Sequence, residues 1–526
     1  MSNKPRNKAL ETWTVRKPAV EATGGLVTSQ HYVASDVGAR VLAGGGNAVD
    51  AAVATGLAIG AVEPWMSGLG GGGFMLVYVA DEQCVYAVDF GMRAPEKLDP
   101  EDYPLVSGTD HDLFGWPAVR EDRNLAGPLS FTVPGFVAGH ALALERFGTR
   151  SWRESLAPAI ELAEHGMVVD WYATLKVAGG APTLAQFAES ARTYLPGGFV
   201  PAAQWGGPLP HIKLGNLGRT LKRLAEAGPR DFYEGDIAEA IVADAAELGS
   251  RLSRDDLARY HASVVPTEIS TYRGATVHVA PRLTAGPTLC RALKLLESRF
   301  TAGTSPDARA YSAYAACLLD AYAERLATLG DSGSEAPSCT THLSVVDADG
   351  NMVALTQTLL SVFGSKVMLP QTGILMNNGI MWFDPRPGSP NSIAPGKRPL
   401  ANMCPTIVER ADDFRIAVGA SGGRRSMSAV LQLISFLVDY RMSLDDACHQ
   451  PRIDVSGTPV VRADNRLAPD IVNTLSQHYE VSTATHGVYP ALFACPNIVA
   501  RDAARGINLG GAYVMSPWAK VSVAGS

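Results

Sequence analysis

A pair of threonines stands where a loop-like segment gives way to a strand-like one, at Cys339-Thr340-Thr341-His342. A threonine hydroxyl is a weak nucleophile unless a base takes its proton, and a free α-amino group on the same residue, with a pKa near about 8, can be that base. Backbone cleavage between Cys339 and Thr340 would create this amine. The pair alone is also what β-propensity produces at the beginning of a strand, so both interpretations stand.

A second pattern with chemical potential is Gly419-Ala420-Ser421-Gly422-Gly423, between a strand-like segment at 414–418 and an amphipathic segment at 427–440. The spacing matches G-x-S-x-G, in which a strand–turn–helix exposes a serine nucleophile. The acids and histidines that such an enzyme needs downstream are present as Asp445, Asp446, Asp454, His449 and His478. Two glycine amides at a helix N-terminus can instead form an oxyanion hole for a nucleophile elsewhere. A plain structural turn is the third interpretation.

The glycine run Gly68-Leu69-Gly70-Gly71-Gly72-Gly73 matches the G-x-G-x-x-G dinucleotide fingerprint in letters only. That fingerprint follows a strand and opens a helix, so that the pyrophosphate meets the helix N-terminus. Here a helix-like segment precedes the run and a strand-like segment follows it. The run therefore predicts close backbone packing rather than a cofactor site.

The elements around these motifs alternate between helical and strand patterns. Helices are expected at 34–43 and 48–62, the second capped by Asn47 and Asp50. Hairpins are expected at 74–90 and at 341–359, the latter turning at an Asp-Gly pair. The polar small-residue segment 329–338, which directly precedes Cys339, predicts an exposed loop. Together these patterns indicate a layered α/β protein.

Composition narrows the classes of function. The chain has 526 residues, 18% of them charged, and a formal net charge of -7, so it offers no basic surface for nucleic acid. Its seven cysteines show no Cys-x-x-Cys spacing, which predicts reduced core thiols and no metal site. The start of the chain is polar and lacks the apolar core of a secretory signal, and the longest apolar stretch, 51–62, is too short for a bilayer. A cytoplasmic location without membrane attachment is expected.

Several motifs recur together in one known family. They are Gly45 to Ala52, the run from Ser67 to Phe74, Thr340 to Asp347, Phe363-Gly364, Gly373 to Asn378, Pro399-Leu400 with Met403, and Gly422-Gly423. In this combination, in register from about residue 25 onward, the chain resembles the gamma-glutamyltranspeptidases. The resemblance implies a four-layer αββα N-terminal-nucleophile hydrolase fold. It also implies that the precursor cuts itself into a large subunit, 1–339, and a small subunit, 340–526, which stay associated.

The resemblance also assigns roles by position. Thr340 matches the nucleophile, Thr358 matches the threonine whose hydroxyl assists it, and Gly422 with Gly423 match the oxyanion-hole pair. Ser421 then becomes a neighbour of the site rather than its nucleophile. The chemistry implied is attack by Thr340 on an amide carbonyl with its own amine as base, and it requires no metal or organic cofactor.

The substrate pocket is where the chain departs from that family. The asparagine, glutamine and aspartate that hold the α-ammonium of a γ-glutamyl group are replaced by Leu360, Gly379 and Trp382. The serine pair that holds the α-carboxylate is replaced by Ala401-Asn402, and the carboxylate-binding arginine falls at Gly91. Arg93, two residues further on, points to the same face if the segment is a strand, and could hold the same carboxylate.

These replacements favour an amidohydrolase acting on a small carboxylate-bearing amide such as oxamate, with Arg93, Asn402, Trp382 and Leu360 around the acyl group. Losing one partner of a buried ion pair costs about 2–5 kcal/mol, and here the whole ammonium site is gone. A glutathione hydrolase or γ-glutamyltransferase is the first alternative, and an unprocessed binding homologue is the second. The expected partners are the small-molecule substrate and the two subunits of one precursor, with assembly into higher oligomers left open.

Overall fold

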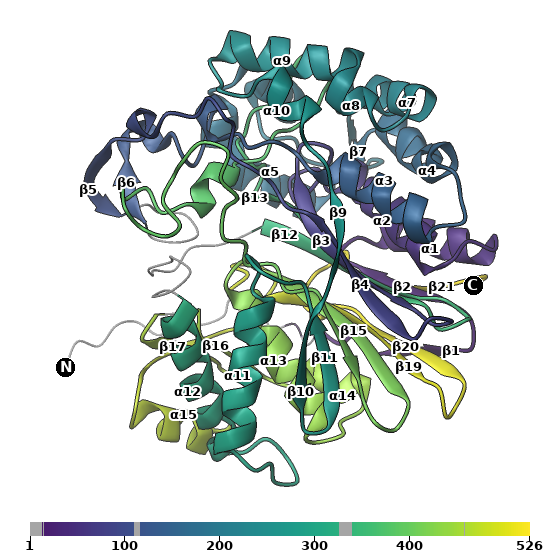
Figure 1. Ribbon diagram of the computed structural model, residues 1–526, viewed down its shortest axis with the longest axis vertical. Helices are drawn as coiled ribbons and strands as arrows, with labels where there is room; N and C mark the ends of the chain where they lie inside the picture. The colour runs from purple at the N-terminus through teal and green to yellow at the C-terminus, as the bar shows by residue number, and fades with distance from the viewer. Residues whose placement is uncertain (1–12, 14, 110–115, 326–338, 457) are drawn as a thin grey trace.

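The computed structural model describes residues 13, 15–109, 116–325, 339–456 and 458–526. The polar segment 329–338 expected to be a loop lies outside these residues, and so does most of the N-terminal start. Two large sheets run through the middle of the described molecule, and helices cover both of their outer faces (Figure 1).

The first sheet carries Thr340. All its strand pairs are antiparallel. In spatial order its described strands are β21 (Lys520–Val523), β2 (Leu26–Ser29), β12 (Cys339–Val346), β13 (Met352–Leu360), β3 (Gly72–Val79), β4 (Cys84–Phe90) and β9 (Ser263–Pro266). The expected hairpins at 74–90 and 341–359 are confirmed as β3–β4 and β12–β13.

The second sheet carries the strand that leads into the glycine pair, and it too is antiparallel. Its described strands, in spatial order, are β1 (Val20–Ala22), β20 (Ile507–Gly511), β19 (Cys495–Asp502), β15 (Phe414–Ser421), β14 (Thr406–Glu409), β11 (Ala275–Val279) and β10 (Glu268–Tyr272). Smaller sheets join β16 (Ile453–Asp454), β17 (Val460–Asp464) and β18 (Glu480–Ala484), β5 (Leu105–Thr109) and β6 (Pro117–Val119), and β7 (Met167–Val168) and β8 (His211–Ile212).

The helices form the two outer layers. Those on the side of the first sheet are α1 (Tyr32–Ala43), α2 (Ala48–Val62), α3 (Phe136–Phe147), α4 (Trp152–His165), α5 (Trp171–Leu184), α6 (Ala188–Tyr194), α7 (Leu217–Ala227), α8 (Asp231–Glu234), α9 (Asp236–Leu248) and α10 (Arg254–Ala258). Those on the side of the second sheet are α11 (Gly286–Arg299), α12 (Ala308–Arg325), α13 (Arg425–Val438), α14 (Leu444–His449) and α15 (Pro469–Ser476).

Three apolar clusters correspond to the three interfaces between these layers. Side chains alternate along each strand, so each strand of a sheet feeds two of them. On β12, Leu343 and Val345 pack under the helices of the first sheet, whereas Val346 belongs to the cluster between the sheets. On β15, Ala417 faces the first sheet and Val418 faces the helices behind. The expected four-layer αββα arrangement is confirmed.

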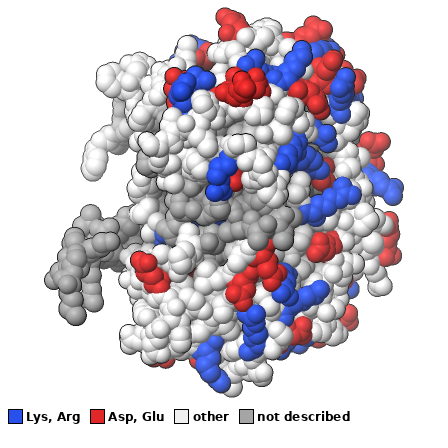
Figure 2. Space-filling view, turned by 60° about the vertical axis from the view of Figure 1, so that its left-hand side comes forward, with Lys and Arg blue, Asp and Glu red and all other residues white. Residues whose placement is uncertain are grey.

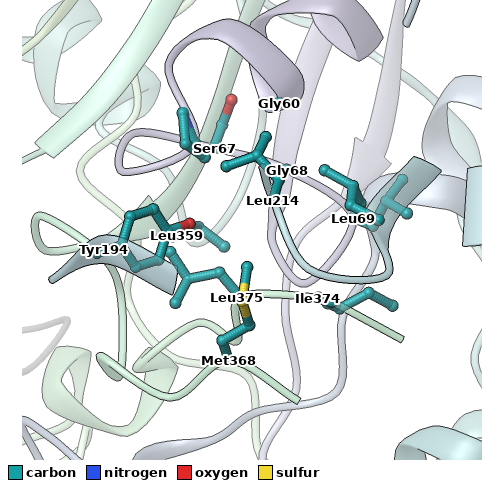
Figure 3. A pocket seen from close by; sticks show the side chains of 13 residues that line it. Gly60, Ser67, Gly68, Leu69, Tyr194, Leu214, Leu359, Met368, Ile374 and Leu375 are labelled. Atoms are coloured by element: carbon teal, nitrogen blue, oxygen red, sulfur yellow. The ribbon is translucent and has the colours of Figure 1, made fainter. Parts of the chain in front are cut away.

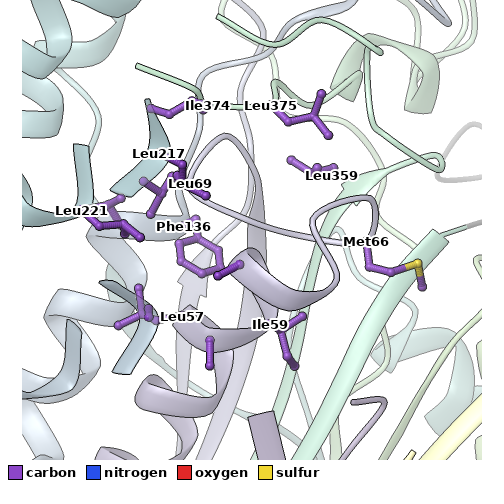
Figure 4. Packing of buried hydrophobic residues seen from close by; sticks show 14 of the residues in the cluster. Leu57, Ile59, Met66, Leu69, Phe136, Leu217, Leu221, Leu359, Ile374 and Leu375 are labelled. Carbon is purple, nitrogen blue, oxygen red and sulfur yellow. The ribbon is translucent and has the colours of Figure 1, made fainter. Parts of the chain in front are cut away.

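Local sequence signals explain how the elements around the site begin. The side chain of Asn47 accepts hydrogen bonds from the amides of Val49 and Asp50, and the Asp50 carboxylate accepts one from the Asn47 amide, so the expected capping box starts α2. The glycine run then leads into β3 beside β13, where a side chain on Gly71 would overlap the carbonyl of Thr358. The prediction of close backbone packing is confirmed. Leu69 within the run is anchored in the apolar cluster with Leu57 and Leu217 (Figure 4).

The charged surface, the hydropathy of the helices and the state of the cysteines bear on the expectations from composition. Basic and acidic side chains are interspersed over the face shown in Figure 2. Among the described residues, no helix is both long and apolar enough to cross a bilayer. The cysteines other than Cys339 are free, with Cys290, Cys317 and Cys404 buried.

The interleaving of the strands generates a prediction about the cleaved protein. β12 and β13 lie between β2 and β3, so segments on both sides of the Cys339–Thr340 bond build the same sheet. In proportion to length, cleavage of the 55.6 kDa chain there yields fragments of about 36 and about 20 kDa. We expect both on a denaturing gel, with the intact mass retained in native mass spectrometry, because separation would expose two sheet edges and a core. An active protein that stays full length would contradict this expectation.

Candidate active site

Thr340 lies at the beginning of β12, 5% exposed, and its Oγ1 donates a hydrogen bond of 3.3 Å to Oγ1 of Thr358 on β13. The hydroxyl of Thr358 also accepts a bond of 2.8 Å from the amide of Leu360. Both threonines project from the face of the sheet that looks toward the second sheet, as the alternation along each strand requires. The structure therefore brings the two predicted catalytic threonines into contact.

A bulge separates these two residues from the regular part of the ladder. Cys339 pairs with Leu360, whereas Thr341 pairs with Gln357, so β13 carries one extra residue opposite Thr340. Bulges are frequent beside active sites because they redirect a side chain without ending the sheet. Here the bulge falls on the stretch that contains Thr358.

The buried His342 fixes the distance between the two sheets beside Thr340. Its Nδ1 bonds to Oγ1 of Thr356 at 2.8 Å and its Nε2 to Oγ of Ser344 at 3.0 Å, while burial lowers its pKa to about 3, so the ring is neutral. A methyl group on Gly419 of β15 would overlap this imidazole. Asn497 on β19 donates to the carbonyl of His342 at 3.0 Å and ties the second sheet to the same place.

The glycine pair lies at the same end of the sheets as Thr340. Thr28 pairs with Ser344, so the chain running on to Gln30 approaches the beginning of β12. The side-chain amide of Gln30 donates to the hydroxyl of Ser421, which ends β15. Ser421 is thus on the Thr340 side of His342, and Gly422 follows it directly.

The backbone at this pair is suited to binding an anion. Gly422 has φ +136° and Gly423 has φ +59°, conformations that favour glycine, and α13 begins two residues later at Arg425. Amides at a helix N-terminus carry partial positive charge, so they stabilise a developing oxyanion. Gly422 is partly accessible, whereas the hydroxyl of Ser421 is 2% exposed and bonded to Gln30. This geometry fits the oxyanion-hole interpretation better than the serine-elbow interpretation.

The side of the site where the acyl group is expected, here called the acyl side, is apolar. Leu360 and Trp382 are 1% and 5% exposed and belong to one cluster between the sheets, together with Ala401. Leu360 has φ +88°, which is unusual for a branched side chain. The structure thus places the predicted pocket residues Leu360 and Trp382 in one apolar cluster, with the amide of Leu360 bonded to Thr358.

At two positions this chain has a glycine where the family carries a polar side chain, and the structure leaves no room for such a side chain at either of them. A side chain on Gly379 would overlap Thr132, which lies 247 positions earlier in the chain. At Gly91 a Cβ atom would lie 2.6 Å from Nη2 of Arg398, whose guanidinium forms a paired ionic contact with Asp89. Other side chains occupy the space of the missing groups.

The two predicted carboxylate ligands, Arg93 and Asn402, lie in different places. Arg93 is exposed and lines a pocket on the outer side of β4 with Arg259, Tyr260 and Arg398, and β13 and β3 lie between that edge and β12. Asn402 is 4% exposed, and its Oδ1 accepts a bond of 3.5 Å from Arg325. Neither residue has a described contact with Thr340.

The structure adds a cation that the sequence patterns did not single out. Arg424 directly follows the glycine pair, is 5% exposed, and holds its guanidinium 6.0 Å from the ring centre of Trp116. Trp116 belongs to the same apolar cluster as Leu360 and Trp382. Only its position next to the two glycines could have indicated a role for Arg424. Its burial could not be expected, because arginines are mostly exposed.

A separate small pocket lies on the opposite face of β13 (Figure 3). It is lined by Leu69, Tyr194, Leu359 and Leu375, and Leu359 belongs to the cluster under the helices rather than to the acyl side. Most of its lining residues are apolar or glycine, and Ser67 and Tyr194 add hydroxyl groups. Among the described residues, no group of three or more His, Cys, Asp or Glu side chains could hold a metal ion.

Comparison with known proteins agrees with this geometry. The family model described as gamma-glutamyltranspeptidase matches residues 34–339 and 332–503. The acylase ACY 1 proenzyme of Pseudomonas sp. (strain SE83) is 33% identical over 489 residues, which cover 85% of each chain. The glutathione hydrolase proenzyme of Escherichia coli (strain K12) is 32% identical over 520 residues, which cover 87% of this chain and 85% of that protein.

Solved structures share the fold. A cephalosporin acylase from Bacillus halodurans superposes with a TM-score of 0.84 at 24% identity, covering 99% of both chains. The gamma-glutamyltranspeptidase of Helicobacter pylori superposes with a TM-score of 0.50 at 28% identity, covering 61% of this chain and 86% of that one.

The contact between the two threonines generates the first prediction about the site. Thr340→Ala should abolish self-cleavage and lower kcat by about 10³-fold or more, because one hydroxyl serves both reactions. Thr340→Ser keeps a hydroxyl and should keep cleavage. Ser421→Ala is the matched test of the rival nucleophile. If it abolished turnover while Thr340→Ala stayed active, the serine-elbow interpretation would be right.

The second prediction concerns Gly422. An alanine there would adopt a strained backbone and place its Cβ 3.0 Å from Cα of Ala494, so the amide must move. Loss of one oxyanion donor lowers kcat by about 10²–10³-fold. Gly506→Ala is the control, because Gly506 also has a positive φ, +67°, but no atom within 4 Å of the added methyl. Equal turnover of the two variants in a steady-state assay would remove Gly422 from the mechanism.

Proposed function

The chain belongs to the gamma-glutamyltranspeptidase family of autoprocessing amidohydrolases, and we propose that its substrate is a small amide whose acyl group carries a carboxylate, as oxamate does. Membership of an enzyme family argues against a purely binding role. The proposal concerns which amide is cleaved and which residues hold it.

In the proposed reaction, the hydroxyl of Thr340 attacks the amide carbonyl and passes its proton to the α-amine of the same residue. Thr358 holds that hydroxyl through the bond of 3.3 Å, and the amides of Gly422 and Gly423 receive the oxyanion. The protonated amine then donates to the leaving nitrogen, which departs as an amine. Water attacks the resulting ester, with the α-amine again as base, and releases the acid.

The filled and apolar acyl side is the observation that carries the proposal. The side chains of Leu360, Trp382 and Ala401 offer no oxygen that can bind an ammonium, and Thr132 fills the space at Gly379. An α-ammonium there would lose its ionic partners, at a cost of about 2–5 kcal/mol for each buried pair lost. A short, flat acyl group without an ammonium avoids this cost.

A carboxylate on the acyl group finds polar partners at the edges of this apolar space. Asn402 follows Ala401 directly, and Arg424 lies against Trp116 next to the glycine pair. Arg93 remains a proposed ligand, although it would have to reach inward from the exposed rim. One cation is enough for a substrate with a single carboxylate.

Glutathione hydrolysis is the second candidate, because relatives described as glutathione hydrolases and as acylases are about equally similar to this chain, at 32% and 33% identity. It requires a different set of ammonium ligands. A comparison of substrates on one enzyme preparation separates the two activities.

The proposal predicts a kcat/KM for oxamate at least about tenfold higher than for a γ-glutamyl anilide on the matured enzyme. The reverse order would support the glutathione-hydrolase alternative. Oxamate is expected to be the better substrate because the enzyme lacks the partners for the α-ammonium of a γ-glutamyl group. The assay measures release of ammonia or aniline over a range of substrate concentrations.

Arg93→Ala should raise KM for oxamate, if Arg93 holds the carboxylate. Arg259→Ala is the matched control, since it removes a cation from the same outer pocket. If both variants had the same KM for oxamate, Asn402 and Arg424 would remain as the proposed carboxylate ligands.

A further inference from the structure

Gly422 needs support that its own backbone cannot give. A glycine has no side chain to anchor it, and the φ of +136° at Gly422 is one of many values that a glycine can adopt. A hydrogen-bond donor stabilises an oxyanion efficiently only if its direction is fixed before the reaction. The groups that hold Gly422 in place therefore matter to the proposed oxyanion hole.

The segment 493–495 lies against the glycine pair. Cys495, the first residue of β19, pairs with Ser421, the last residue of β15. A Cβ atom on Gly422 would lie 3.0 Å from Cα of Ala494, so the main chain of Ala494 is in close contact with Gly422. The thiol of Cys495 interacts with the hydroxyl of Ser421. A shift of this segment would therefore shift Gly422 as well.

The imidazole of His486 packs against this segment. Its ring centre lies 5.0 Å from that of Phe493 and 5.6 Å from that of Tyr513. His486 is buried, and burial lowers its pKa to about 4, so the ring is neutral at neutral pH. Its Nδ1 lies 3.0 Å from Nη2 of Arg466. A guanidinium can only donate, so Nδ1 accepts and the proton of the ring lies on Nε2.

The proton on Nε2 orients the hydroxyl of Tyr513. His486 donates to that hydroxyl at 2.8 Å, so the proton of the hydroxyl points elsewhere, and the thiol of Cys495 is its neighbour. Arg466 is itself held by the fully buried Asp464, through bonds of 2.5 Å and 3.1 Å. These side chains form one connected path from a buried carboxylate to the strand partner of Ser421.

Tyr513 also contacts the other half of the site. Its backbone amide donates to Oδ1 of Asn497 at 3.3 Å, and Nδ2 of Asn497 donates to the carbonyl of His342 at 3.0 Å. His342 lies on β12, two residues after Thr340. One tyrosine is thus connected to the strand of the proposed nucleophile through its main chain and to the glycine pair through its hydroxyl.

We propose that Tyr513 and His486 are positioning residues, which hold the segment 493–495 against Gly422 so that the Gly422 amide faces the oxyanion formed at Thr340. The inference rests on the proposed oxyanion role of Gly422. Both residues act through this segment rather than by contact with the substrate. Their loss should therefore slow the reaction without weakening substrate binding.

Tyr513→Phe tests the inference because it removes the hydroxyl and keeps the ring. We expect kcat of the matured enzyme to fall about tenfold while KM changes less than about twofold, because a misdirected donor loses part of the effect of about 10²–10³-fold that one oxyanion donor has. Tyr233→Phe is the matched control and should keep kcat, since Tyr233 on α8 is also buried and its hydroxyl donates to the carbonyl of Pro134 at 3.1 Å. An unchanged kcat in Tyr513→Phe would overturn the proposal.

Two variants of His486 separate the hydrogen bond from packing. A glutamine can place its amide nitrogen near the position of Nε2 and donate to Tyr513, whereas a leucine fills a similar volume without a donor. We expect His486→Gln to keep most of kcat and His486→Leu to lose as much as Tyr513→Phe. Equal kcat values for the two His486 variants would exclude a role for this hydrogen bond.

A double-mutant cycle identifies the group through which Tyr513 acts. Gly422→Ala already displaces the amide, so adding Tyr513→Phe should lower kcat by less than about twofold further. Two losses that multiply would mean that Tyr513 acts elsewhere, and would reject the inference. The ratios are compared on whichever amide the matured enzyme hydrolyses, oxamate or a γ-glutamyl anilide, because both form an oxyanion.

The same variants separate this inference from the proposed function. A fully active Gly422→Ala variant would reject the oxyanion role itself, and the inference with it. An impaired Gly422→Ala variant together with a fully active Tyr513→Phe variant would reject only the positioning role. A preference for the anilide over oxamate would reject the proposed substrate and leave the positioning role intact.

Discussion

The contact between the imidazole of His342 and the bare backbone of Gly419 sets the spacing of the two sheets, and the active site depends on that spacing. The proposed nucleophile stands on one sheet and the proposed oxyanion donors follow a strand of the other, so neither sheet alone holds the proposed site. A neutral, doubly hydrogen-bonded ring is a rigid spacer, because its polar atoms are satisfied and burial holds it uncharged. A larger residue in place of Gly419 would push the donors away from Thr340.

The site also has two chemically different sides, and the strand order explains why. The side toward β13 is lined by apolar groups that belong to the inter-sheet core, such as Leu360 and Trp382. The side toward β2 is lined by groups at the ends of helices, among them Glu63 and Arg425, where backbone ends and charged side chains gather.

Much of this could be predicted from the sequence where the signal is local. The capping of α2 by Asn47 and the two hairpins depend on neighbours within a few residues. The close packing of the glycine run could be predicted because only glycine lets two backbones approach that closely. The contact between Thr340 and Thr358 followed from a family resemblance rather than from spacing. What stayed hidden depends on distant segments: Thr132 filling the space at Gly379 and Trp116 lying against the buried Arg424. Arg93 shows where a local rule fails. The alternation of side chains along β4 was extended past the end of that strand, and it did not predict that Arg93 is exposed.

Leu360 combines a positive φ, +88°, with a side chain that disfavours it. Asparagine, the residue that the family carries at this place, tolerates such a backbone far better. Local conformational energy therefore opposes the leucine, and its packing in the apolar cluster between the sheets must offset that cost. The change between leucine and asparagine at this position is therefore not equally easy in both directions. A mutation from leucine toward asparagine is favoured by the backbone, and the reverse step is opposed by it, so a lineage can leave the apolar pocket more easily than it can enter it.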